Sequence, residues 1–424
     1  MTATSVTARR VAALLAGAGL VAACAALARV PDLAGAPVTF LLLYAGAFAS
    51  YALGAWLLHA ARGRAALLLV LGVAGAARLA LLPAAPTLST DAYRYVWDAR
   101  VARAGISPYA YPPEAPEVGH LRDAEIYPRL NHPTWRTIYP PGAQALFRAV
   151  HWLRPDSVLA MKIALGLIEA IGVAALIGML GALGVSRTRA VIYAWNPLVL
   201  LEGWGSAHLD ATVVAAVVGA IWAQAAGRHA LAGGLLGAGT LLKLYPAALL
   251  PLLMGPGALA ALGAFAAVLA LGYAPAAGGG LSVLGSLPRY LSEEYFNPGL
   301  LRTLVDVPGL SVGALAAWVF WQGTRRREAP LPARALPVIG GYLLLSPNLF
   351  PWYALWLVPV LAAVPSLPWI AFTGTVAMAY TFFLEEPWAI PWWARVAEAV
   401  PLLAGAACWL HRLRPAAALA ERSP

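Results

Sequence analysis

Long uninterrupted apolar runs constrain the fold of this chain more than any other feature of its sequence. One of them, from Ile163 to Leu183, contains a single ionisable residue, Glu169. A helix of about 17 to 25 apolar residues spans a bilayer, whereas the strands of a membrane β-barrel alternate apolar and polar residues. Because 61% of the residues are hydrophobic and 11% are charged, little of the chain is left for a soluble domain. We therefore predict an all-α, polytopic transmembrane helical bundle that forms a single integral membrane domain over residues 1–424.

The apolar runs predict 12 to 14 membrane segments. The count depends on residues 229–254, where Lys243, Pro246 and Pro251 indicate either one kinked span or two half-helices that meet near Lys243. The predicted spans lie at about 11–29, 37–61, 65–83, 157–184, 188–203, 208–226, 229–254, 257–275, 305–323, 331–346, 352–365, 367–384 and 393–411.

The distribution of arginines predicts the orientation of these spans. If the N-terminus is cytoplasmic, the inner loops hold 14 arginines against Glu328 and Glu421, and the rest of the chain has a net charge of −2. This excess follows the positive-inside rule and places residues 84–141 on the extracytoplasmic side. It accounts for the overall charge of +10 without a nucleic-acid partner, because the basic residues do not form one stripe. The inner arginines are Arg9, Arg10, Arg62, Arg64, Arg187, Arg189, Arg228, Arg325, Arg326, Arg327, Arg334, Arg412, Arg414 and Arg422.

The outer segment 84–141 contains the most informative pattern of polar residues. Near its start, Ser89 or Thr90 can cap a helix whose first turn contains Asp91. Arg94 follows Asp91 by three residues and precedes Asp98 by four, so one guanidinium can hold two carboxylates on the same face. The alternative is a surface helix with ordinary ion pairs.

Aromatic residues and the length of the same segment add to this interpretation. Tyr93 and Trp97 lie four residues apart on the predicted helix and suit either a sugar platform or a membrane-interface belt. The segment has about 60 residues and is rich in Pro and Tyr, so we expect a structured loop rather than a connector. Its six acids equal its six arginines in number, which argues against a polyanion-binding surface.

Several polar groups lie within or beside the predicted spans. Asn196, Glu202, His208 and Asp210 fall in one helix–turn–helix at the outer face, where ionisable groups indicate a cavity or a partner charge. The alternative is a polar turn just outside the membrane.

Glu169 and Lys243 each lie in an apolar run without a charge nearby in the sequence. The two could pair with each other, Lys243 could pair with Glu202, or Lys243 could extend its ammonium to the interface.

Several motifs resemble those of GT-C-type glycosyltransferases, multi-spanning bacterial membrane enzymes that use a polyprenyl-phosphate sugar, and in particular their mannosyltransferase branch. The similarity extends in order over about 260 residues, with Ala99 and Ala207 at two positions where such sequences often have Gly. The motifs are D-x-Y-R-Y-x-W-D-x-R-V (Asp91–Val101), G-I-x-P-Y (Gly105–Tyr109), N-H-P and I-Y-P-P (within Asn131–Pro141), W-N-P-L-V-L-L-E (Trp195–Glu202), H-L-D (His208–Asp210), L-K-L-Y-P (Leu242–Pro246) and S-P-N-L-F-P-W-Y (Ser346–Tyr353).

The resemblance implies transfer of a hexose, by resemblance mannose, from a polyprenyl-phosphate donor to an extracytoplasmic glycolipid or glycan acceptor, with inversion at the anomeric carbon. A carboxylate in the first outer loop would then serve as general base, and we assign this role to Asp91, with Asp98 as the second catalytic candidate. The leaving phosphate needs cationic stabilisation, for which Lys243 and His208 are preferred, followed by Arg94, Arg100 and Arg136.

The remaining assignments concern the substrate, the cofactor and the location. We expect no cofactor, because Asp91, Asp98, His208 and Asp210 form no compact metal-ligand motif, although they could hold a divalent ion. The expected location is a bacterial plasma membrane, with the site facing outward. A transporter or flippase that uses Glu169, Glu202 and Lys243 as an ion path is the alternative function. The predicted substrate-binding residues are Tyr93, Trp97, His132, Tyr139, Asn196, Glu202, Asp210, Asn348 and Trp352.

Overall fold

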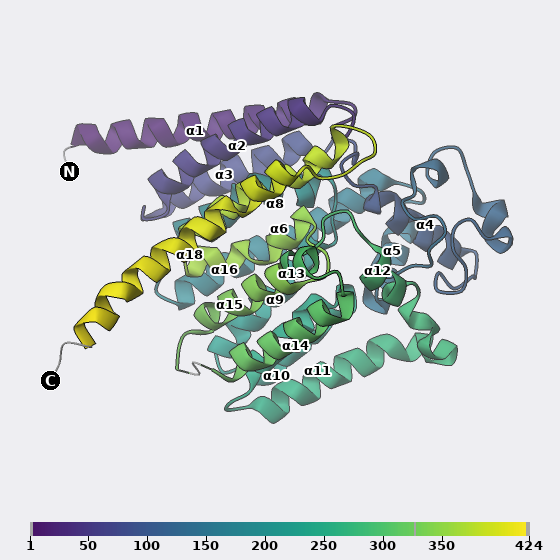
Figure 1. Ribbon diagram of the computed structural model, residues 1–424. Helices are drawn as coiled ribbons and strands as arrows, with labels where there is room; N and C mark the ends of the chain where they lie inside the picture. The colour runs from purple at the N-terminus through teal and green to yellow at the C-terminus, as the bar shows by residue number, and fades with distance from the viewer. Residues whose placement is uncertain (1–2, 326–327, 421–424) are drawn as a thin grey trace.

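The structure, a computed structural model, describes residues 3–325 and 328–420, and every named element in these residues is a helix or helical turn (Figure 1). Arg326, Arg327, Glu421 and Arg422, which were assigned to inner loops, lie outside the described residues. In the first half of the chain the elements are α1 (Ala3–Arg29), α2 (Pro37–Leu58), α3 (Arg64–Leu81), α4 (Asp91–Arg103), η1 (Pro116–Leu121), η2 (Tyr127–Arg129), α5 (Pro141–Leu153), α6 (Val158–Ala182), η3 (Arg187–Ala190), α7 (Val191–Ala194), α8 (Pro197–Leu200), the π-helical turn η4 (Leu201–Gly205) and α9 (Asp210–Ala225).

The second half of the chain contains shorter helices and more breaks. Its elements are α10 (His229–Leu242), η5 (Tyr245–Leu253), α11 (Ala258–Tyr273), η6 (Ala274–Leu284), α12 (Leu287–Glu293), α13 (Leu300–Leu304), α14 (Pro308–Thr324), α15 (Leu331–Leu345), η7 (Pro351–Trp356), α16 (Val358–Ala363), α17 (Leu367–Thr375), η8 (Val376–Phe383) and α18 (Trp392–Ala420). One isolated β-bridge joins Pro298 and Asn348.

The predicted all-α membrane protein is confirmed, but the count of 12 to 14 membrane segments is not. Five described helices are long and apolar enough to cross a bilayer, and a sixth span would consist of Pro197–Gly205 and Asp210–Ala225, which meet at 119°. Four further apolar helices are shorter, because breaks divide runs that are continuous in hydropathy. The spanning helices are Ala8–Arg29, Pro37–Leu58, Arg64–Leu81, Val158–Ala182 and Ala258–Ala276, and the shorter ones are His229–Leu242, Leu331–Leu345, Pro351–Ala363 and Leu367–Phe383.

The two ends of the bundle differ in composition. At one end, which we call the arginine end, Arg9 Nε donates to Leu57 O and Ser186 Oγ donates to Ala61 O, so the α2–α3 and α6–η3 connections lie together with the chain start. At the opposite end, Leu33 N donates to Thr87 Oγ1 beside the 84–141 loop. Figure 1 shows α4, α5 and α12 gathered at this second end, which we call the loop end.

Lys243 lies at the tip of a helical hairpin. The helix α10 ends at Leu242, the backbone of Lys243 is extended (φ −153°, ψ 141°), and η5 begins at Tyr245. The chain then runs back towards the start of α10. Gly257, which follows η5, lies next to His229, the first residue of α10, and a Cβ on Gly257 would be 2.0 Å from the imidazole. Gly257 also has φ +75°, which favours glycine. Of the two alternatives for residues 229–254, the structure therefore has two helical segments that meet near Lys243.

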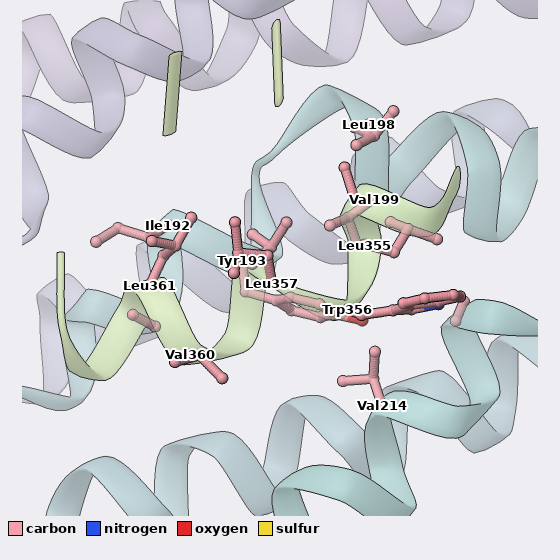
Figure 2. Close-up of a cluster of buried hydrophobic side chains, with 14 of the residues drawn as sticks. Ile192, Tyr193, Leu198, Val199, Val214, Leu355, Trp356, Leu357, Val360 and Leu361 are labelled. Atoms are coloured by element: carbon pink, nitrogen blue, oxygen red, sulfur yellow. The ribbon is translucent and has the colours of Figure 1, made fainter. Parts of the chain in front are cut away.

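Large aromatic side chains fill the centre of the bundle. Figure 2 shows Tyr193 and Trp356 among aliphatic residues of α7, α8, η7 and α16, at the middle of the buried cluster. Trp195 is also fully buried, and its Nε1 donates to Val70 O at 2.8 Å. Its ring packs against Gly54, where a Cβ would lie 2.3 Å from the indole. Small residues in α2 therefore allow a bulky residue of the interrupted segment to enter the core.

A buried ion pair connects α3 to α6. Arg78 Nε and Nη2 donate to the two carboxylate oxygens of Glu169 at 3.0 and 2.7 Å, and Trp204 Nε1 donates to the same carboxylate at 3.1 Å. The predicted pairing of Glu169 with Lys243 is therefore wrong. Arg78 is the partner because α3 and α6 are adjacent in space, although the two residues are 91 positions apart in the chain. A bidentate guanidinium satisfies a carboxylate that has no access to water.

We expect Glu169→Gln to lower the free energy of unfolding by about 3 kcal/mol, because the Arg78 charge is left uncompensated in an apolar environment. Thermal unfolding in detergent measures the effect. The double variant Arg78→Gln/Glu169→Gln should recover part of the loss. Rescue of Glu169→Gln by Lys243→Gln would contradict the pairing seen here.

Candidate active site

A cavity of about 1000 Å³ opens at the loop end of the bundle. Its wall combines the 84–141 loop, the tip of the α10–η5 hairpin and the segment from α12 to η7. Polar groups and aromatic rings dominate one part of the wall, and aliphatic side chains of α12 and α14 the other. The polar and aromatic lining residues include Ser89, Thr90, Asp91, Arg94, Asn131, His132, Trp135, Arg136, Tyr139, Lys243, Tyr245, Tyr290, Glu294, Asn348, Trp352, Tyr353 and Trp356.

Asp91 presents a carboxylate to this cavity from the first residue of α4. Its Oδ1 accepts from Asn131 Nδ2 at 2.7 Å, and its Oδ2 lies 3.5 Å from His208 Nδ1. Burial opposes ionisation of Asp91, but His208, the Asn131 amide and the Lys243 charge outweigh it and lower the pKa to about 2. The helix N-terminus also favours a negative charge at this position. Asp91 is therefore a carboxylate at every physiological pH, with an exposed fraction of 15% on its side chain.

The link between α4 and the broken span passes through Tyr95. Its hydroxyl accepts from Leu209 N at 3.3 Å, and its ring stacks on Phe147 of α5. These contacts hold the start of α9 against α4, so that His208 comes next to Asp91. Tyr95 was part of the recognised motif, but its anchoring role depends on a contact over 114 positions.

His208 lies behind Asp91, away from the cavity wall. Its imidazole is fully buried, with Nε2 3.3 Å from Glu202 Oε2, and it stacks on Trp352 with ring centroids 3.8 Å apart. Glu202 is also fully buried and accepts from Tyr380 OH at 2.7 Å. His208 was predicted to bind the phosphate and Glu202 to bind the substrate, but neither residue lines the cavity.

The backbone around His208 departs from regular helix. Residues 201–205 form a π-helical turn, a feature frequent at functional sites. Ala207 then adopts a left-handed conformation with φ +59°, which few non-glycine residues do. Glycine would adopt this conformation without the steric cost that alanine has. The break turns the chain by 119°, and it brings His208 next to Asp91 and Asp210 next to Lys243, behind the residues that line the cavity.

Lys243 and Asp210 form an ion pair between the two broken helices. Lys243 Nζ lies 2.6 Å from Asp210 Oδ2, and Trp356 Nε1 donates to Asp210 Oδ1 at 2.7 Å. The ammonium also lies 4.9 Å from the centre of the Tyr353 ring. Asp210 is fully buried, whereas the Lys243 side chain retains 21% exposure and lines the cavity. The predicted pairing of Lys243 with Glu202 is therefore wrong, because Glu202 faces His208.

Arg94 holds one of its two expected carboxylates. Its Nε donates to Asp98 at 2.9 Å and its Nη2 to Trp135 O at 2.9 Å, while Asp91 turns to Asn131 and His208. Asp98 is buried, accepts a second bond from Gln144 and does not line the cavity. The predicted Arg94 bridge between two carboxylates is thus wrong, because Asn131 and His208 from other segments contact the Asp91 carboxylate instead.

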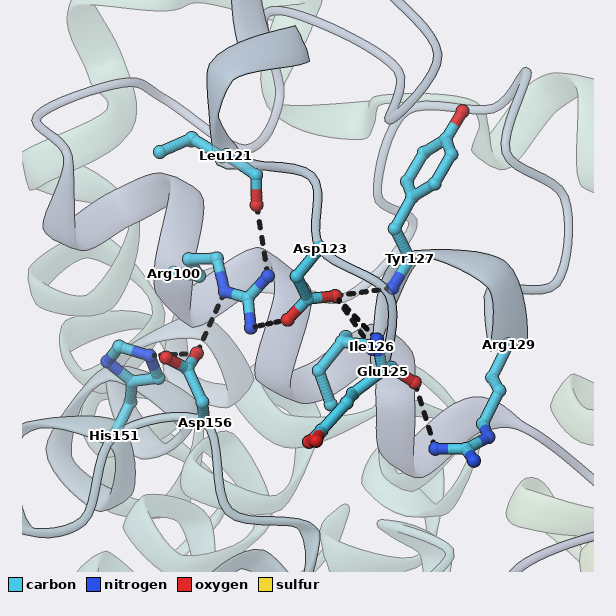
Figure 3. A network of polar contacts seen from close by, with 9 residues as sticks. All are labelled: Arg100, Leu121, Asp123, Glu125, Ile126, Tyr127, Arg129, His151 and Asp156. Carbon is cyan, nitrogen blue, oxygen red and sulfur yellow. Dashed lines mark hydrogen bonds and ion pairs between the residues drawn. The ribbon is translucent and has the colours of Figure 1, made fainter.

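Arg100 belongs to a separate polar network on the outer loop. As Figure 3 shows, it contacts Asp123 and Asp156 at 2.6 and 2.8 Å, and Asp156 also contacts His151. Tyr93 and Trp97 lie on the same side of α4, where Tyr93 contacts Arg129 and Trp97 contacts Tyr127. None of the three lines the cavity. They stabilise the folded outer loop, and the structure does not bring them to Asp91.

The other predicted substrate residues divide into two groups. His132, Tyr139, Asn348 and Trp352 line the cavity with Asp91. Asn196 does not, since it is fully buried, caps α8 and donates to Thr373 at 2.9 Å.

Several other cavity residues were not assigned in advance, among them Asn131, Tyr290 and Glu294. Asn131 belongs to the N-H-P motif and could have been found there. Glu294 was hidden in a loop with no expected role, and it pairs with His132 Nε2 at 3.1 Å.

The protein has no ready-made cage for a metal ion in its described part, since no group of three or more His, Cys, Asp or Glu side chains there is placed to hold one. The three ionisable groups that the alternative transporter would use as an ion path are paired with other side chains in the structure. Glu169 is occupied by Arg78, Glu202 by His208 and Tyr380, and Lys243 by Asp210.

The fold and the site together define the class of this protein. It is an all-helical membrane protein with an ionised carboxylate on the wall of a large cavity. Comparison with known families gives the particular assignment. Residues 2–261, more than half of the chain, match the MptA_B family, described as alpha-(1->6)-mannopyranosyltransferase, N-terminal domain. The chain belongs to this family, and it is a glycosyltransferase. Comparison with curated proteins and with solved structures found no match.

We expect Lys243→Gln to lower the free energy of unfolding by about 3 kcal/mol, because buried Asp210 loses its counter-charge. The double variant Lys243→Gln/Asp210→Asn should recover most of this loss, as measured by melting temperature in detergent. If Lys243 also binds the donor phosphate, kcat/KM for donor should fall roughly a hundredfold, about 2.7 kcal/mol, in both variants. A stable double variant with unchanged donor kinetics would restrict Lys243 to a structural role.

Proposed function

We propose that the protein transfers mannose from a polyprenyl-phosphate donor to a glycolipid or glycan acceptor, with inversion at the anomeric carbon. The observation that carries this proposal is the position of Asp91, an ionised carboxylate on the wall of a cavity of about 1000 Å³. A cavity of this size accommodates two sugar units in contact. Membership of a mannosyltransferase family supports mannose as the transferred sugar.

Asp91 acts as general base in this reaction. The acceptor hydroxyl oxygen attacks the anomeric carbon, and its proton passes to an Asp91 carboxylate oxygen. The bond between the anomeric carbon and the phosphate oxygen breaks, and its electron pair leaves with the phosphate. A carboxylate of low pKa suffices, because the hydroxyl becomes strongly acidic as the new bond forms at an oxocarbenium-like carbon.

Cations around the cavity stabilise the negative charge of the leaving phosphate. Arg94 is neutralised by Asp98 and Lys243 by Asp210. Arg136 lines the cavity and makes no ion pair with any residue that the structure describes. Arg136 and the partly exposed Lys243 ammonium are therefore the groups that we assign to the phosphate, one as a planar donor and one as a point charge. His208, preferred from the sequence, is too deeply buried for this contact.

The cavity wall also suits a lipid-linked donor. Leu287, Leu291, Val312 and Leu315 form an aliphatic part of the wall, and Phe382, Phe383 and Trp388 extend it. An apolar wall next to two cations matches a molecule in which a hydrocarbon chain ends in a phosphate. The wall belongs to the loop end, which we assign to the extracytoplasmic side because the opposite end carries the excess of arginines.

Transfer of radiolabel from polyprenyl-phosphate mannose to a membrane lipid extract tests the proposal directly. Mannose should be transferred in preference to the glucose and arabinose analogues. Transfer from a nucleotide sugar, with no transfer from any polyprenyl phosphate, would exclude the proposed donor.

In this assay, Asp91→Asn should reduce transfer by several orders of magnitude, because an amide cannot accept the proton. Asp98→Asn is the matched control. It alters a buried carboxylate of the same helix that lies off the cavity, and we expect a smaller loss through displacement of Arg94. Turnover of Asp91→Asn close to that of the unmodified enzyme would remove Asp91 from the role of base.

Cysteine labelling tests the orientation. In a background with Cys24→Ala and Cys408→Ser, Glu117→Cys on the outer loop should react with an impermeant thiol reagent in intact cells. Arg62→Cys at the arginine end should react after the cells are opened. Both positions are exposed in the folded protein. Labelling of Arg62→Cys alone in intact cells would invert the assigned topology.

A further inference from the structure

Two buried residues extend from Asp91 into the bundle. His208 lies between the Asp91 and Glu202 carboxylates, with Nδ1 3.5 Å from Asp91 Oδ2 and Nε2 3.3 Å from Glu202 Oε2. Tyr380 OH donates to the other oxygen of Glu202 at 2.7 Å. Asp91 thus lies on the cavity wall, and the His208 imidazole and the Glu202 carboxylate follow it into the bundle.

The fold allows His208 little freedom in this position. Trp352 covers one face of the imidazole at 3.8 Å, and the backbone N of His208 donates to Glu202 O at 2.8 Å. Asp210, two residues later, is bound by Lys243 and Trp356. Of the described charged side chains, only Asp91 and Glu202 form ion pairs with the ring. Because the imidazole is fully buried, substrate cannot contact it without movement of Trp352 or Asp91.

We propose that His208 and Glu202 are positioning residues, which act on the transfer reaction by keeping Asp91 ionised and fixed in orientation. This inference rests on the proposed function of Asp91 as base. Glu202 stabilises the imidazolium of His208, and the imidazolium in turn stabilises the Asp91 carboxylate. Neither residue touches the substrate.

The contacts among Asp91, His208 and Glu202 oppose protonation of the Asp91 carboxylate. A carboxylate in an apolar membrane cavity tends to take up a proton, and a protonated Asp91 could not accept the acceptor proton. Burial by itself gives the charged form of the His208 imidazole a free-energy cost. The second carboxylate, Glu202, offsets that cost, while the π-helical turn and the left-handed Ala207 position Glu202 and His208 relative to each other.

The pH dependence of kcat in His208→Asn tests the inference. Asparagine keeps a polar group near Asp91 but removes the positive charge, so the pKa of Asp91 should rise towards or above its ordinary value. Activity of the unmodified enzyme should stay level as the pH falls from 7 to about 4.5, since Asp91 remains ionised. His208→Asn should lose at least about tenfold in kcat over that range, with the KM for the donor changed less than about threefold.

Glu202→Gln gives a second, independent variant. Glutamine retains an acceptor for Tyr380 but no charge, so His208 is less readily protonated, and an acid limb should appear that is weaker than in His208→Asn. His151→Asn is the matched control. His151 is also buried and paired with a carboxylate, Asp156, but it lies on the outer network away from the cavity, so its pH profile should remain level.

Each alternative role for His208 predicts a different result. A direct phosphate contact would raise the donor KM of His208→Asn and leave the pH profile level. A merely structural role would lower the melting temperature of both variants and leave the profile of the remaining activity level. Either result overturns the inference. Failure of the proposed function is recognised separately, because the unmodified enzyme would then transfer nothing from polyprenyl-phosphate mannose.

Discussion

The ion pair between Lys243 and Asp210 is the interaction on which the cavity depends. Two apolar segments break at the same level of the bundle, one before Asp210 and one at Lys243. Helix ends leave backbone groups without partners, and a lipid environment offers no water to satisfy them. The ion pair joins the two breaks, and the indole of Trp356 donates to the second oxygen of the buried Asp210 carboxylate. The floor of the cavity is therefore made of irregular backbone that lines a polar space rather than lipid, the one setting in which such backbone is tolerated within a membrane protein.

Above this floor, two separate loops close the cavity against each other. His132 pairs with Glu294, and Arg136 N donates to Ser286 Oγ. Gly285 approaches Thr137 so closely that a Cβ would lie 1.7 Å from its carbonyl oxygen. These contacts are few and include the exposed His132, in contrast to the dense aromatic packing around Trp356. Local stability in proteins follows such differences in contact, so the roof is the part of the site where opening costs least free energy. The roof can therefore open for substrate exchange while the floor of the cavity stays rigid.

Part of the site could be predicted from residue types and spacing. Asp91, in the first turn of α4, and Lys243, between two short apolar helices, are both on the cavity wall. The failed predictions share one cause, since each assumed that a charge in an apolar run pairs with a charge near it in the sequence or with the other isolated charge. Glu169 instead pairs with Arg78, which the hydropathy pattern places at the end of a span. Similarly, the spacing of Arg94 suggested a bridge, but Asp91 contacts Asn131 and His208, which other segments of the chain bring to it.

The sequence by itself determined that this is an all-helical membrane protein, because apolar runs of this length leave no other way to satisfy backbone hydrogen bonds in a bilayer. It also determined the uneven distribution of arginines and, through the order of its motifs, the class of enzyme. Only the tertiary structure decided which runs break, and therefore that fewer helices are long enough to span than hydropathy suggests. It alone decided that His208 lies behind Asp91 rather than in front of it. Such facts depend on which helices are neighbours, and the energies of buried ion pairs and packed aromatic rings act between residues more than a hundred positions apart, where spacing along the chain carries no information.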